Sequence, residues 1–170
     1  MTKTKGRRQR KEKVLVTIAR ILGTGVFICT ILLLLPLALP RMMGYSTYNV
    51  VSGSMEPEIP VGSLILVKPV DCSELKTDDI IAFYRENIVV CHRVVENNTF
   101  EGKLSTKGDA NDTEDFGVLT YADVIGIVEY HFPVLGSIGA YVSTTSGKLL
   151  IVELLVVAVL LHIMVDRIRS

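Results

Sequence analysis

The fold is decided by residues 79–95, DIIAFYRENIVVCHRVV, which read as two β-strands separated by a tight turn. Apolar and β-branched residues fill both halves, and the polar triplet Arg85-Glu86-Asn87 lies between them. Alternate side chains of a strand point to opposite faces, so His92 faces the side opposite to Cys91 and Arg93. The stretch therefore predicts β structure with a histidine on one face of the second strand.

Further short runs of the same kind extend this pattern on both sides of the hairpin. They lie at residues 48–51, 63–68, 103–106 and 124–128, and turn residues separate them, among them Asn97-Asn98. Several short strands at this spacing are typical of a small β-barrel or folded sheet and not of alternating strands and helices. We therefore expect a mainly β, barrel-like domain over residues 45–132, flanked by helices.

A basic arm and a long apolar run precede this domain. Residues 1–13 carry seven Lys and Arg side chains against one acid, and residues 14–39 are mostly apolar. About 20 apolar residues suffice to cross a bilayer, and basic residues beside a span favour the cytoplasmic side. Pro40-Arg41 follows the run where a cleaved signal sequence would have a small-residue site. We expect a retained anchor at 14–39 behind a cytoplasmic arm, and no nucleic-acid-binding role for that arm.

A second apolar stretch covers residues 149–165. It has the minimum length for a span, and Glu153 is costly in a bilayer unless it lies at the interface or faces another helix. Two interpretations stay open: a second transmembrane helix at 148–166 with a cytoplasmic tail at 167–170, or an amphipathic or core helix. The glycine- and serine-rich segment 133–147 suits a position at the membrane surface.

The polar residues do not point to a metal site or a disulfide framework. Three cysteines, one of them inside the first apolar run, are too few for a disulfide scaffold. Residues 107–115, KGDANDTED, hold four acidic groups. Counted from Asp109, however, the sixth and twelfth EF-hand positions fall on Glu114 and Thr120, where glycine and glutamate are needed. Histidine or cysteine ligands at zinc-site spacing are also missing from the sequence pattern. We expect no cofactor and no metal.

A serine on a turn is the main candidate for chemistry. Residues 52–57, SGSMEP, place Ser54 just after the first predicted strand. A serine hydroxyl needs a base to become a nucleophile, and His92 is the histidine of the predicted strands with polar neighbours. The acidic turn at 107–115 offers an aspartate to orient an imidazole. A lone histidine in an apolar strand is more often a core residue, so the pattern alone leaves both interpretations open.

Together these motifs resemble the type I signal peptidases, and more closely their endoplasmic-reticulum-like branch. The resemblance runs from about residue 48 to residue 132. It rests on three motifs in order, namely residues 52–57 with Gly62, His92-Arg93-Val94, and residues 107–111 with Asp115. In the bacterial branch a lysine is the base where this chain has His92.

The resemblance implies a role for each of four residues. Ser54 would be the nucleophile and His92 the base, with Asp115 orienting His92. Asp109 belongs to the same motif as Asp115 and is the second candidate for the orienting carboxylate. A serine–lysine dyad stays open as a different arrangement, with four lysines available: Lys68, Lys76, Lys103 and Lys107.

The resemblance also implies an activity and a location. The chain would be a membrane-bound serine endopeptidase that cleaves N-terminal signal peptides from secreted preproteins after small residues. Its partners would be preproteins and the lipid bilayer, with contacts to the secretion machinery left open and no nucleic acid. The N-terminus would be cytoplasmic and the catalytic domain extracytoplasmic, in a multi-pass or single-pass protein according to the last helix. The alternative is a non-catalytic membrane-tethered β-domain adaptor or a degenerate peptidase, which would usually have lost one of the three motif residues.

Overall fold

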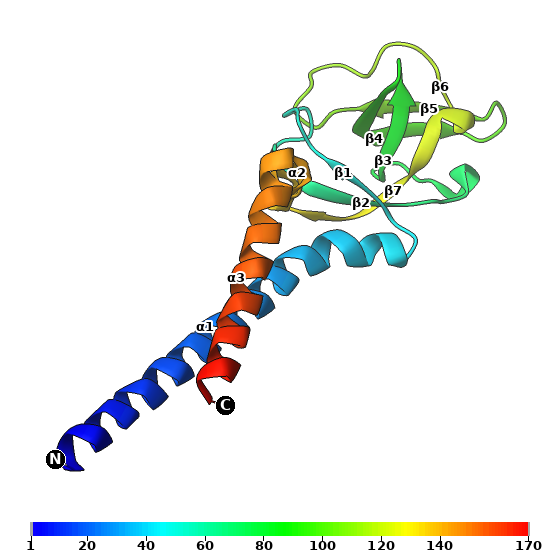
Figure 1. The fold of residues 1–170 in the computed structure, drawn as a ribbon. Coiled ribbons are helices and arrows are strands. Elements are labelled where there is room, and N and C mark those ends of the chain that lie inside the picture. Colours follow the sequence, from blue (N-terminus) through cyan, green and yellow to red (C-terminus); the bar gives the residue numbers. More distant parts are fainter. Residues whose placement is uncertain (1, 170) are drawn as a thin grey trace. The chain divides into compact units, whose positions relative to one another are not determined.

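The computed structural model describes the backbone of residues 2–169 and, within it, the side chains of residues 14–167 (Figure 1). The side chains of the predicted basic arm and of the last three residues lie outside the described residues. The elements follow in the order α1 Thr2–Met42, β1 Ser46–Asn49, β2 Leu64–Lys68, η1 Cys72–Glu74, β3 Ile80–Arg85, β4 Ile88–Asn98, β5 Lys103–Lys107, β6 Leu119–Thr120, η2 Tyr121–Asp123, β7 Val124–Phe132, α2 Leu135–Ser143 and α3 Thr145–Arg169.

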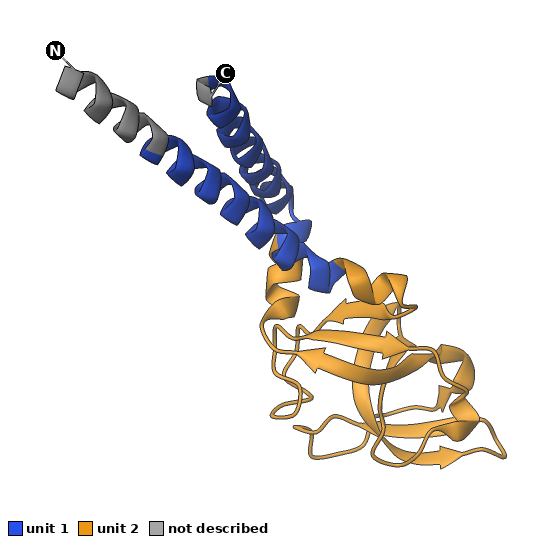
Figure 2. Cartoon of the chain, turned by 90° about the horizontal axis from the view of Figure 1, so that it is seen from below, with its two compact units in different colours: residues 1–37, 142–170 blue, residues 38–141 orange. Residues whose placement is uncertain are grey.

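The chain divides into two compact units, shown in different colours in Figure 2. The first comprises residues 1–37 and 142–170, and the second comprises residues 38–141. The second unit contains one antiparallel sheet with the strand order β1-β2-β7-β3-β4-β5-β6. The prediction of a mainly β domain flanked by helices is confirmed. The sheet is open, with β1 and β6 as its edges, and is not clearly a barrel.

One predicted turn is wrong. Asn97-Asn98 lies inside the sheet, because β4 runs from Ile88 to Asn98. The Asn97 amide donates to the carbonyls of Cys72 and Leu75, both at 2.9 Å, and its oxygen accepts from the Tyr121 hydroxyl at 2.6 Å. These partners come from segments remote in sequence, so a rule based on local turn propensity could not anticipate them. The two-residue strand β6 is too short to show a period and was not predicted.

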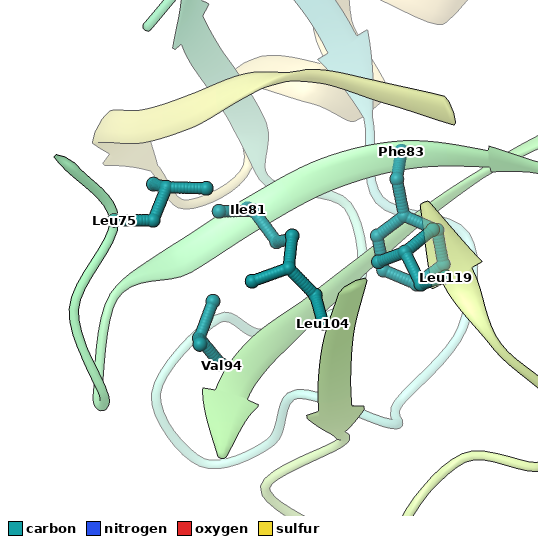
Figure 3. Close-up of a cluster of buried hydrophobic side chains, with 6 residues drawn as sticks. All are labelled: Leu75, Ile81, Phe83, Val94, Leu104 and Leu119. Carbon is teal, nitrogen blue, oxygen red and sulfur yellow. The ribbon is translucent and has the colours of Figure 1, made fainter. Parts of the chain in front are cut away.

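Apolar side chains pack on both faces of the sheet, as the alternation along β3 requires. On one face lies the cluster of Figure 3, formed by Leu75, Ile81, Phe83, Val94, Leu104 and Leu119. The opposite cluster comprises Met55, Ile59, Ile65, Val67 and Ala82. His92 lies opposite Ile81 in the β3–β4 register, and directly paired residues share a face, so His92 is on the face of the first cluster.

The first unit is built from two long apolar helices. The segments Val14–Met42 and Thr145–Arg167, of 29 and 23 residues, are long and apolar enough to cross a membrane. Within this unit α1 and α3 share polar contacts: the Thr24 hydroxyl and His162 Nε2 are 3.3 Å apart, and Arg20 lies 3.4 Å from Asp166. Two exposed apolar helices are consistent with membrane association.

Candidate active site

The loop between β1 and β2 carries Ser54 and is fixed at both ends. The N–H of Val50 donates to the Ser63 carbonyl at 2.9 Å, which closes the loop at its base. Beyond the serine, the Ile59 N–H donates to the Met55 carbonyl at 2.8 Å. Met55 and Ile59 are fully buried in the second cluster. The apolar side chains therefore hold the turn, while Ser54 itself stays half-buried and accessible.

Ser54, His92 and Asp115 form a continuous chain of hydrogen bonds. Ser54 Oγ lies 3.1 Å from His92 Nε2, and His92 Nδ1 lies 2.5 Å from Asp115 Oδ2. Because an ionised carboxylate can only accept, the Nδ1–H donates to Asp115, which leaves Nε2 as the acceptor for the serine hydroxyl. The side chains of His92 and Asp115 are 9% and 8% exposed, so water has little access to their contact.

The carboxylate of Asp115 has two further neighbours that the sequence pattern did not predict. The Thr106 hydroxyl donates to Oδ2 at 2.7 Å, and the Asp115 N–H donates to the Thr106 carbonyl at 2.8 Å. Arg85 Nη1 lies 3.9 Å from the same oxygen. The available signal for Thr106 was its place in β5. It lies two residues after Leu104 and so on the same face of the strand, which makes it a polar residue at an inward-facing position.

Asp109 has a different partner from Asp115. Its two carboxylate oxygens accept from Arg93 Nε at 2.8 Å and Nη2 at 2.6 Å. This carboxylate raises the pKa of the Arg93 guanidinium. Among the described residues Asp109 has no hydrogen bond to His92. The structure therefore brings together three of the four residues singled out in the sequence and places the fourth in an ion pair with the strand residue next to His92.

The ion pair lies at the base of a short loop that contacts the nucleophile segment. The Ala110 N–H donates to the Ser54 carbonyl at 2.9 Å. A Cβ atom at Gly108 would lie 2.7 Å from that carbonyl oxygen and 2.7 Å from Asn111 Nδ2, closer than side chains tolerate. Glycine at this position is therefore required for the close approach of the loop to Ser54.

The neighbours of the Ser54 hydroxyl bear on whether a lysine, and not His92, could act as its base. In the described part of the chain its partners are His92 and Ser52, whose Oγ lies 3.4 Å away, and none is a lysine. The Phe83 ring packs edge-on against the imidazole, with centroids 6.3 Å apart. Over the same residues no group of three or more His, Cys, Asp and Glu side chains is arranged to hold a metal ion.

Comparison with known proteins found signal peptidases among the relatives of the chain. No protein-family model matches the chain. It is 45% identical over 80 residues to signal peptidase I W of Bacillus subtilis, a match covering 45% of this chain and 42% of that protein. It is 31% identical over 101 residues to the signal peptidase complex catalytic subunit SEC11C of Homo sapiens and of Canis lupus familiaris, covering 52% of this chain and 53% of each relative. The chain spans about half the length of the curated relatives it matches. Over the matched residues, the chain is therefore similar to signal peptidases of a bacterium and of mammals.

Proposed function

We propose that the chain is a membrane-bound serine endopeptidase that removes N-terminal signal peptides from secreted preproteins, cutting after small residues. The observation that carries the proposal is the pair of contacts that joins Ser54 to His92 at 3.1 Å and His92 to Asp115 at 2.5 Å. Nucleophile, base and orienting carboxylate in this geometry are the requirements of acyl transfer by a serine. The similarity to proteins named as signal peptidases supports the choice of substrate.

In the proposed reaction Ser54 Oγ attacks the scissile carbonyl carbon while His92 Nε2 accepts its proton. The imidazolium so formed is stabilised by Asp115, which also holds the neutral ring in the tautomer that leaves Nε2 unprotonated. His92 then gives the proton to the leaving amine, and the mature protein departs with a new N-terminus. Water, deprotonated by His92, hydrolyses the acyl-enzyme and releases the signal peptide.

The negative charge that develops on the carbonyl oxygen needs hydrogen-bond donors. The Ser52 hydroxyl is one candidate, because its Oγ lies 3.4 Å from the attacking atom and its side chain is exposed to incoming substrate. The backbone N–H of Ser54 is the second. Donors that are already in place stabilise an oxyanion without reorganisation during the reaction.

The proposed topology follows from the charge distribution. Seven basic residues precede the first candidate span, and Arg167 and Arg169 end α3. If both helices cross the bilayer, the positive-inside rule places both termini in the cytoplasm and the sheet on the extracytoplasmic face.

A signal peptide keeps its apolar segment in the same bilayer, so enzyme and substrate meet at a raised effective concentration. The open edge at β1 is a candidate for pairing with an extended substrate. Contacts with the secretion machinery belong to this same proposal.

The experiment is cleavage of a preprotein by the full chain in proteoliposomes. The substrate carries alanine at positions −1 and −3, and mass spectrometry locates the cut. We expect release after the alanine at −1 by the wild-type chain and by Ser73→Ala, a control at an exposed surface serine. Ser54→Ala should release no product above background. Equal cleavage by Ser54→Ala and wild type would refute the proposed activity.

A further inference from the structure

Thr106 is a buried polar residue beside the proposed triad that the mechanism above does not use. It is 1% exposed, and it lies on β5 opposite Val94 of β4, within two residues of His92 along the neighbouring strand. A hydroxyl buried at such a position must find a hydrogen-bond partner, because leaving it unpaired is costly. The partner it has is the Asp115 carboxylate.

The contact between Thr106 and Asp115 is double. The threonine hydroxyl donates to Oδ2 at 2.7 Å, and its carbonyl accepts the Asp115 N–H at 2.8 Å. One bond therefore fixes the backbone of Asp115, and the other fixes its side chain. The oxygen that Thr106 binds is the same one that accepts from His92 Nδ1 at 2.5 Å. Two directed donors on one oxygen define the rotation of the carboxylate.

Besides Thr106 and His92, the side chain of Arg85 lies next to this carboxylate in the described residues. Its Nη1 is 3.9 Å from Oδ2, beyond hydrogen-bond distance, and its side chain is 31% exposed. The guanidinium lies over the Phe83 ring, 5.4 Å from the centroid. Arg85 therefore contributes charge near Asp115 but no directed bond, and the orientation of the carboxylate depends on the hydroxyl of Thr106.

We infer that Thr106 is a positioning residue of the active site: its hydroxyl holds the Asp115 carboxylate in the orientation that fixes the tautomer and direction of His92. The inference rests on the proposed function. Without the hydroxyl, the carboxylate rotates away from His92 and the ring less often presents Nε2 to Ser54. Because Thr106 is 1% exposed, it has almost no surface that a substrate could contact, and we expect substrate binding to be unaffected.

The test compares Thr106→Val, which keeps the shape and removes the donor, with Thr106→Ser, which keeps the donor. We expect Thr106→Val to lower kcat by about 10-fold at unchanged KM, as loss of one hydrogen bond to a charged group implies. Thr106→Ser should restore kcat to near the wild-type value. Where Thr106→Val fails to fold by circular dichroism, Thr106→Ala replaces it in the same comparison.

A control of the same chemistry exists at an exposed position of the same domain. The Thr120 hydroxyl on β6 also donates to a carboxylate at 2.7 Å, that of Asp123, and in the described residues it has no hydrogen bond to Ser54, His92 or Asp115. Thr120→Val loses a hydrogen bond of the same length and should leave kcat unchanged. An unaltered kcat in Thr106→Val, a change in KM alone, or an equal loss in Thr120→Val would each overturn the inference.

A second readout separates this inference from the proposed function. The proton on His92 Nδ1, held against a carboxylate, gives a downfield NMR signal that is assigned by its loss in His92→Gln. Thr106→Val should shift or broaden this signal, and Thr106→Ser and Thr120→Val should not. If the wild-type chain does not cleave preprotein but the signal responds in this way, the proposed function fails and the positioning role stands. An unchanged signal in Thr106→Val overturns the positioning role, whether or not the chain cleaves.

Discussion

Arg93 binds both carboxylate oxygens of Asp109, with Nε 2.8 Å from Oδ1 and Nη2 2.6 Å from Oδ2. The same guanidinium donates through Nη1 to the Asp78 carbonyl at 2.8 Å. Since Arg93 follows His92 on β4, the ion pair ties the strand of the proposed base to the loop whose Ala110 N–H holds the Ser54 carbonyl. The order of the motifs alone could not decide whether Asp109 or Asp115 orients His92. In the structure, Asp109 is paired with Arg93.

Asp109→Asn should therefore act on stability more than on chemistry. The variant leaves Arg93, whose side chain is 29% exposed, without its charged partner, at a cost of about 1–3 kcal/mol in unfolding free energy. We expect a lower Tm in detergent micelles and a modest fall in kcat from loosening of the loop. A complete loss of activity at unchanged Tm would instead assign Asp109 a direct part in the reaction.

Asp115→Asn should lower the rate of the reaction more than the stability of the fold. The amide can turn its NH₂ group toward His92 Nδ1 and so favour the tautomer that cannot accept the Ser54 proton. We expect kcat to fall on the order of 10³–10⁴-fold with little change in KM. Circular dichroism and thermal unfolding check that the protein remains folded. Near-wild-type kcat in a folded Asp115→Asn protein would exclude Asp115 as the orienting group.

Gly108→Ala tests how closely the loop approaches the nucleophile segment. The added Cβ would lie 2.7 Å from the Ser54 carbonyl oxygen, so either the loop or the serine must shift. We expect a clear loss of kcat from displacement of Ser54. The control is Gly25→Ala, where a Cβ atom meets nothing within 4 Å. Unchanged kinetics in Gly108→Ala would mean that the approach is dispensable.

Much of the architecture could be predicted from the sequence because it depends on local patterns. The alternation in residues 79–95 identified β3 and β4, and it placed His92 on the face opposite to Cys91. The extent of β4 could not be predicted, because Asn97 is held by partners remote in sequence.

The candidate site, too, could be predicted only in part from the sequence. Ser54, His92 and Asp115 were found by motif and resemblance, and their roles remain proposals. Two features depend on how β4, β5 and the loop after β5 meet in space. They are which aspartate, Asp109 or Asp115, contacts His92, and the hydrogen bond from Thr106 to the Asp115 carboxylate. No rule of spacing along the chain contains that information.

Cys91 provides a pH-dependent test of the fold. Burial, together with the nearby Asp109 carboxylate, raises the pKa of this thiol from 9.0 to about 12, and Arg93 opposes the shift. A raised pKa contributes stability that is fully present below pH 9.0, the pKa of the unfolded thiol, and is lost as pH rises toward 12. We expect urea unfolding to show a steeper loss of stability above pH 9 in the wild type than in Cys91→Ala. Parallel pH profiles would show that the thiol is not buried in this way.

The central claim is that Ser54 and His92 act as one catalytic unit, and the rate of preprotein cleavage measures it most directly. Single-turnover rates are compared for wild type, Ser54→Ala, His92→Ala and the double variant, with His131→Ala on β7 as the histidine control. Residues that act as a unit lose their whole contribution when either is removed. We predict that both single variants and the double variant fall to the same residual rate, while His131→Ala cleaves like the wild type. A wild-type rate in Ser54→Ala or His92→Ala would contradict the account. So would a double variant slower than the wild type by the product of the two single losses, because that result means independent contributions.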